Sequence, residues 1–146
     1  MQDFNDILRR SLSIVTDGYE KARGDINDVV GLIRGAIKEN IGDNFSLELA
    51  EAKTDIKGST FNIYLDTDIY DLSASIVPVV DIRIPGGGYP VELGDFNKSL
   101  QVFHSRDEVL CSRIDVEQFF AQQLSDPDSS LIQSIGFALR QKANKR

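Results

Sequence analysis

The spacing of the apolar residues changes near residue 42, and this change limits the folds that are open to the chain. From Phe4 to Ile41 apolar residues recur every three or four positions, which is typical of an amphipathic helix. Beyond Gly42 they alternate with polar residues, which is typical of strands with one buried face. The change of period predicts an α+β fold in which helices pack on a sheet.

The N-terminal helical region allows either one long helix or two shorter ones. Asp3 is suited to cap its start, and Gly42 to end it. A single helix would be about 57 Å long at 1.5 Å per residue, and a second subunit would be needed to cover its overhang. Four glycines lower the helix propensity of this region: Gly18, Gly24, Gly31 and Gly35. We therefore favour two helices, over about 3–17 and 25–41. The four-residue spacing of Gly31 and Gly35 predicts close packing of the second one on the sheet.

The segment from residue 43 to residue 114 predicts five or six short strands. The alternating runs cover 45–50, 60–66, 73–84, 89–93, 99–104 and 109–114. The first two runs meet at a turn near 55–58, and Gly86–Gly88 closes another turn. Because the links are too short for crossover helices, the sheet should be mainly antiparallel. Pro78 lacks a backbone donor and marks an edge, a bulge or a break in the third strand.

Helical spacing returns after residue 114. Asp115 is suited to cap a first C-terminal helix, and Ser125-Asp126-Pro127 separates it from a second. No repeat or linker divides the chain, so a single α+β domain is expected over residues 1–146. Its parts are a helical region over 1–42, an antiparallel sheet over 43–114 and a helical region over 115–146.

Acidic residues concentrate in the predicted sheet. Residues 43–95 hold ten Asp or Glu against three Lys or Arg, whereas the flanking segments nearly balance. The net charge of −7 disfavours nucleic acid and attracts a basic protein, although acidity also serves solubility alone. No apolar run approaches the ~20 residues that cross a bilayer. Without a secretory signal or a second cysteine, we expect a cytoplasmic protein that does not contact a membrane.

The leading hypothesis is a non-enzymatic protein-binding module that presents an acidic sheet face to a basic partner. Its expected partner-binding residues are Tyr64, Asp66, Asp68, Tyr70, Asp71, Asp81 and Tyr89. Tyrosine provides contact area at low entropic cost, and carboxylates steer a basic surface. The alternative for the tyrosines is that they pack inward, and for Tyr89 we favour folding back onto the core from the Gly86–Gly88 turn. Small size, acidity and an α+β sheet are similar to immunity proteins, inhibitors and secretion chaperones, which bind other proteins.

An enzyme or covalent carrier that uses Cys111 is an alternative. If Asp107 and Glu108 form a two-residue hairpin loop, His104 faces Cys111 across paired strands and could activate the thiol. The more ordinary expectation is that Cys111 is buried in its strand and that His104 lies in solvent. The order of elements resembles the core of ubiquitin-conjugating enzymes. The His-Pro-Asn stretch of that family is missing, so no residue takes a role from the resemblance.

No cofactor or metal site is predicted. Asp66, Asp68 and Asp71 are closely spaced but lack the glycine and glutamate of a calcium-binding EF-hand loop. Gly86–Gly88 lacks the Lys-Ser/Thr ending and the following helix of a phosphate loop. A third hypothesis for the function is structural, with the N-terminal helical region acting as a homo-oligomerisation arm.

Overall fold

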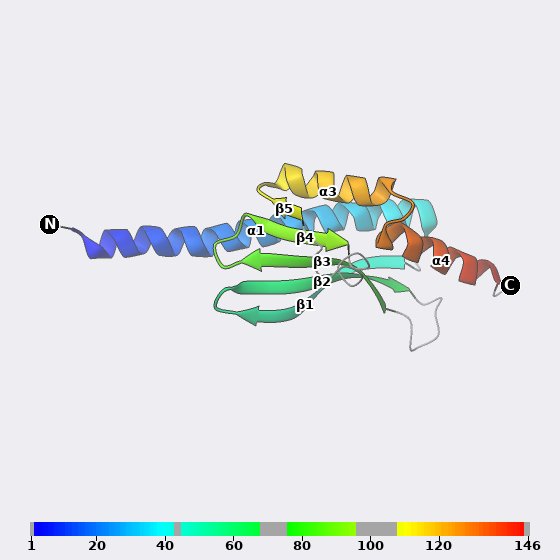
Figure 1. Ribbon diagram of the computed structural model, residues 1–146, viewed down its shortest axis with the longest axis horizontal. Coiled ribbons are helices and arrows are strands. Elements are labelled where there is room, and N and C mark those ends of the chain that lie inside the picture. The colour runs from blue at the N-terminus through cyan, green and yellow to red at the C-terminus, as the bar shows by residue number, and fades with distance from the viewer. Residues whose placement is uncertain (1, 43–44, 68–75, 96–107, 145–146) are drawn as a thin grey trace.

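The structure is a computed structural model that describes residues 2–42, 45–67, 76–95 and 108–144. The chain forms a long helix, then an antiparallel sheet, then two more helices, which confirms the predicted α+β fold (Figure 1). In order, the elements are α1 (Phe4–Ile41), β1 (Phe45–Asp55), β2 (Gly58–Thr67), β3 (Ile76–Pro85), β4 (Val91–Asp95), β5 (Glu108–Leu110), α3 (Arg113–Ser125) and α4 (Ser130–Asn144).

α1 is one continuous helix of 38 residues, so the favoured division into two helices is wrong. The Asp3 carboxylate caps it by accepting a hydrogen bond from the Asp6 N–H at 3.2 Å, and Gly42 ends it with φ of 122°. Its second half packs on the sheet through seven buried residues: Ala22, Asp25, Ile26, Val29, Val30, Ile33 and Ile37. This burial offsets the roughly 1 kcal/mol that each glycine costs in a helix.

Gly18 is the point where the loop at residues 86–88 meets α1. A β-carbon on Gly18 would overlap the carbonyl oxygen of Gly87, and a β-carbon on Gly88 would overlap the carbonyl oxygen of Gly18. The two backbones therefore touch directly. Gly31 and Gly35 make no such contact, because nothing lies within 4 Å of a β-carbon built on either, so the predicted close packing there is wrong.

The sheet is an antiparallel meander with the strand order β1-β2-β3-β4-β5. β1 and β2 join at the predicted turn, where Asp55 pairs with Gly58. Pro78 lies in β3, which is an internal strand. Ile63 pairs with Val80 and its neighbour Tyr64 pairs with Pro78, so one extra residue of β3 bulges out. Of the three expectations for Pro78, the bulge is confirmed.

The helices lie on one face of the sheet and enclose a single core. α1 packs chiefly on β1, α4 packs on β3 and β2, and α3 lies beside α1. The sheet contributes alternating side chains to this core: Phe45, Leu47, Phe61, Ile63, Leu65, Val80, Ile82, Ile84, Val91, Leu93 and Leu110. Figure 1 shows α1 running past the β1–β2 and β3–β4 turns, so its first turns stand clear of the sheet. None of the described helices is both long and apolar enough to cross a membrane.

The start of α3 differs from the sequence prediction. β5 ends at Leu110 and α3 begins at Arg113, so the predicted strand over 109–114 is wrong beyond its second residue. Ser112 is the N-cap in place of Asp115: its hydroxyl accepts a hydrogen bond from the Asp115 N–H at 3.4 Å. The Asp115 carboxylate reaches back to the N–H of Cys111 at 2.9 Å, in the manner of a capping box. The predicted strand over 99–104 lies outside the described residues.

Asp95 fastens the end of β4 to the start of α4. Its buried carboxylate accepts hydrogen bonds from the Ser130 N–H at 2.9 Å and from the Ser130 hydroxyl. Because Ser130 is the first residue of α4, the carboxylate lies at the positive end of the helix dipole. One acid of the acidic segment is thus buried on the helix side of the sheet.

Arg34 connects α1 to β1, which is the first strand in the sheet order. Its Nε donates a hydrogen bond to the carbonyl oxygen of Leu47 at 2.9 Å. Its guanidinium also lies 3.3 Å from the carboxylate of Glu48. The arginine therefore reaches over the edge of the sheet from the helix side to the opposite side.

Candidate functional site

The sheet has a second face that no described helix covers, and we call it the outer face. Strand alternation and register place on it Glu48, Asn62, Tyr64, Asp66, Asp81, Arg83 and Glu92. Asp66 and Arg83 are exposed, and the others are partly exposed. Tyr64 lies opposite Glu48 on one side and Pro78 on the other, so it does not pack into the core.

The outer face brings together three of the predicted partner-binding residues: Tyr64, Asp66 and Asp81. Glu48 and Glu92 add two carboxylates to them. Some of these carboxylates have a cation nearby, because Arg34 contacts Glu48 and Arg83 lies opposite Glu92 in the strand register. The predicted residues Asp68, Tyr70 and Asp71 lie outside the described residues. The described part of the outer face is acidic, although less so than the count over residues 43–95 suggested.

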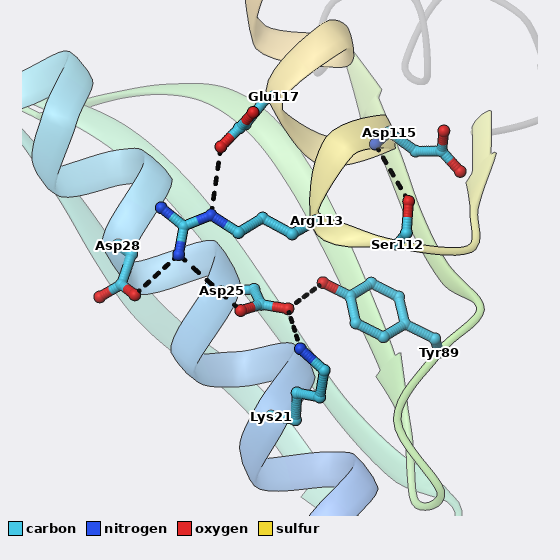
Figure 2. A network of polar contacts seen from close by, with 8 residues as sticks. All are labelled: Lys21, Asp25, Asp28, Tyr89, Ser112, Arg113, Asp115 and Glu117. Carbon is cyan, nitrogen blue, oxygen red and sulfur yellow. Dashed lines mark hydrogen bonds and ion pairs between the residues drawn. The ribbon is translucent and has the colours of Figure 1, made fainter.

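Tyr89 lies apart from the outer face and, as the sequence predicted, folds back onto the core. Its hydroxyl donates a hydrogen bond to the carboxylate of Asp25, on the buried side of α1, at 2.8 Å. Figure 2 shows the tyrosine ring reaching from its loop toward α1. Lys21 is the second partner of Asp25, at 3.3 Å.

Arg113, at the start of α3, completes this polar network (Figure 2). Its guanidinium lies 3.1 Å from Asp28, 3.1 Å from Glu117 and 4.0 Å from Asp25. The network therefore joins α1, the loop before β4 and the first turn of α3. Periodicity could not reveal it, because its contacts between elements join distant residues: Tyr89 and Asp25 are 64 positions apart, and Arg113 and Asp28 are 85.

The electrostatics of this network favour a structural role. Burial and the hydrogen bond to Asp25 raise the pKa of Tyr89 well above its ordinary value, so the phenol holds its proton. The hydrogen bond to Glu117 raises the pKa of Arg113, with Asp28 adding to the effect. A tyrosine that retains its proton and an arginine held by carboxylates fix geometry better than they transfer protons. We infer that the network holds α3 and the 86–90 loop against α1.

The two residues proposed for covalent chemistry are not brought together in the described structure. Cys111 is exposed and follows β5, so the expectation that it is buried inside a strand is wrong. His104 lies outside the described residues, and its pairing with Cys111 stays a prediction. Among the residues that the structure describes, no three His, Cys, Asp or Glu side chains gather as metal ligands would.

A groove lies between α1 and the β1–β2 turn, and we call it the hairpin groove. Its volume is about 400 Å³. It is lined by Val15, Thr16, Tyr19, Glu20, Arg23, Glu51, Thr54, Asp55, Ile56, Gly58, Ser59 and Gly86. The Tyr19 and Ser59 hydroxyls lie 2.6 Å apart, and those of Thr54 and Ser59 lie 3.0 Å apart. Ile56 at the turn is almost fully exposed.

The first turns of α1 form the most apolar exposed surface on a single described element. We call residues 4–17 the overhang, and its large apolar side chains the overhang stripe: Phe4, Ile7, Leu8, Leu12, Ile14 and Val15. All six are exposed. A second apolar groove, of about 270 Å³, lies between α1 and α3 beside Leu32, Phe120 and Leu124. The helical period that predicted α1 already contained most of the overhang stripe, but not the fact that the sheet leaves it uncovered.

Comparison of the chain with models of known protein families, with curated protein sequences and with solved structures gave no match.

Proposed function

We propose that this protein is a non-enzymatic binding module whose outer face docks on a basic segment of a partner protein. The observation that carries the proposal is a sheet face that no described helix covers and on which carboxylates surround a tyrosine. Glu48 lies opposite Tyr64 on β1. Asp66 is the next residue on the same face of β2 as Tyr64. Asp81 pairs with Asn62, the neighbour of Tyr64 on the same face.

A basic, partly apolar segment fits this face better than a small molecule does. Both grooves described above lie away from this face. Tyr64 offers a rigid ring for apolar contact, while the surrounding carboxylates raise the association rate of a positively charged partner.

Nuclear magnetic resonance can test the docking face with a defined probe. The probe is a synthetic peptide in which arginine and leucine alternate, titrated into the isotope-labelled protein at low and at physiological salt. We expect chemical-shift changes at Asn62, Tyr64, Asp66 and Asp81, and weaker binding at higher salt. Changes confined to the overhang or to the hairpin groove would contradict the proposal.

Charge reversal provides the matched comparison. Asp66→Lys with Glu92→Lys should weaken peptide binding by at least tenfold, because two attractions become repulsions on one face. Glu20→Lys with Glu39→Lys makes the same change of charge on exposed positions of α1 and should leave most of the affinity. Equal losses in both double variants would mean that only net charge matters, and the docking face would be rejected.

A further inference from the structure

The overhang stripe is large enough to be an interaction site. Phe4 is 77 % exposed, Leu8 58 % and Leu12 57 %, and three more large apolar side chains lie beside them. Together they expose on the order of 500 Å², which falls in the range of about 300–600 Å² for the largest apolar patch of a typical monomer, and such patches are often interaction sites. No Asp or Glu interrupts the stripe: Asp6 and Asp17 fall on the other side of α1 by helical spacing, and Asp3 is the N-cap at its end.

A second copy of the same chain is the occupant that fits the size of this surface. Two stripes packed together would bury on the order of 1,000 Å², which is the lower bound for a specific interface. Identical surfaces that cover each other form a closed pair with twofold symmetry, and no apolar surface is left over.

The surroundings of the overhang fix the direction of the pairing. Beyond Gly18 the same side of α1 is covered by the 86–88 loop and by β2, where Tyr19 meets Ser59. A parallel partner helix that followed the stripe would collide with this loop, and the two sheets would crowd each other. An antiparallel partner uses only the overhang and leaves the two sheets at opposite ends of the pair.

The length of the overhang then places a side chain in the hairpin groove. Residues 4–17 span about 21 Å at 1.5 Å per residue. When two overhangs overlap in opposite directions to within one residue of their full length, Phe4 of one copy is level with Thr16 of the other. Val15 and Thr16 line the first part of the hairpin groove, and exposed Ile56 stands at its rim. The groove offers a phenyl ring an apolar wall and enough volume.

We propose that the protein is a homodimer in which two α1 overhangs pack antiparallel and Phe4 of each copy enters the hairpin groove of the other. The dimer contact is separate from the outer face, so each copy keeps its docking face. The pair would present two such faces, which strengthens binding to a partner with two basic segments.

Sedimentation equilibrium of the full chain tests the association. We expect a dimer. We expect Leu8→Glu with Leu12→Glu to raise its dissociation constant at least tenfold, because four charges would enter one apolar contact. The folded domain should survive, since both side chains are exposed. Far-UV circular dichroism and the melting temperature of the sheet check this.

The matched control places the same charges elsewhere. Leu32→Glu with Ile114→Glu changes residues that are 65 % and 64 % exposed on α1 and α3. This control should remain as dimeric as the unchanged protein. A monomer at every accessible concentration, or a dimer that only the control disrupts, would overturn the proposal.

Disulfide trapping tests direction and register in a Cys111→Ser background. Phe4→Cys with Thr16→Cys should give a covalent dimer under mild oxidation, whereas Phe4→Cys alone should not, because its two copies would be about 18 Å apart along the pair. Efficient trapping by the single Phe4→Cys variant would show a parallel pair and would overturn the antiparallel arrangement. If neither variant forms a covalent dimer, the proposed position of Phe4 is wrong.

Discussion

Gly18 carries a constraint that its place in a helix does not suggest. Its missing side chain lets the carbonyl of Gly87 lie against α1, so Gly18→Ala should lower the free energy of unfolding by about 1–3 kcal/mol. Gly24→Ala is the control: it lies on the same helix with nothing within 4 Å, and should raise that free energy by about 0.5–1 kcal/mol. Urea denaturation of both variants measures the difference. A stabilising Gly18→Ala would show that the loop does not rest on the helix.

Tyr89 should make stability depend on alkaline pH. The folded protein raises the pKa of this phenol, so the protonated form is favoured by folding. Its contribution is complete below the unfolded pKa of about 10 and is lost as the pH rises above that value. Tyr89→Phe should cost about 1–2 kcal/mol at neutral pH, through the lost hydrogen bond to Asp25, and should flatten the alkaline slope.

The control for this slope is Tyr64→Phe, on the outer face. It should leave the alkaline dependence nearly unchanged, because Tyr64 lies opposite Glu48 on the outer face and is not part of the polar network around Asp25. Stability curves between pH 8 and pH 11, obtained by urea denaturation, separate the variants. Equal slopes for the unchanged protein and Tyr89→Phe would contradict the assigned role of Tyr89.

Local sequence signals predicted the single-residue features that depend on near neighbours. Asp3 and Gly42 act as predicted because a cap needs only the adjacent backbone. The predictions for Asp115 as N-cap and for Cys111 inside a strand were wrong. The alternation over residues 109–114 is typical of a strand, but the helix begins at Arg113 with Ser112 as its N-cap. The contacts of Gly18 and Asp25 join distant parts of the chain, and no pattern along the sequence contains them.

At the scale of the elements, Asp95 decides how β4 and α4 fit together. Asp95→Ala would remove a carboxylate that accepts two hydrogen bonds from buried Ser130, so we expect a loss of roughly 2–4 kcal/mol in the free energy of unfolding. Asp95→Asn keeps one acceptor and should lose less. Urea denaturation followed by circular dichroism ranks the two variants. An Asp95→Ala protein as stable as the unchanged one would show that α4 is held by its apolar contacts alone.

α1 shows why the choice between one helix and two could not be made from propensity. The four glycines argued for a break, and their intrinsic cost is real. The burial of residues from Ala22 to Ile37 against the sheet outweighs that cost, and Gly18 is needed for the loop contact. The strands were predicted more securely, because alternation reports directly which face is buried.

For the whole molecule, stability should be unequal along α1. Amides of residues 22–37 should exchange with solvent only on global unfolding, because this half is packed on the sheet. In the monomeric Leu8→Glu, Leu12→Glu variant, amides of residues 7–14 should exchange far faster, and in the dimer they should be protected. Hydrogen exchange followed by mass spectrometry measures both. Equal protection of the two halves in the monomeric variant would contradict this gradient.

The total charge of the acidic segment predicted the outer face only in part. Alternation correctly assigned Tyr64, Asp66 and Asp81 to one face, because a strand turns successive side chains to opposite sides. Charge counting could not separate them from Asp95, which is buried, or from Glu48, which Arg34 contacts. Both exceptions arise from contacts between a strand and a helix that lies far from it in sequence.

The position of Arg34 also limits how the sheet can grow. The edge of β1 would otherwise offer its outward carbonyls to any extended chain, as in amyloid fibrils. At Leu47 that acceptor is already occupied, and a cation stands where an incoming backbone would have to lie. A foreign strand that pairs with β1 at this point would therefore have to displace Arg34 from both Leu47 and Glu48.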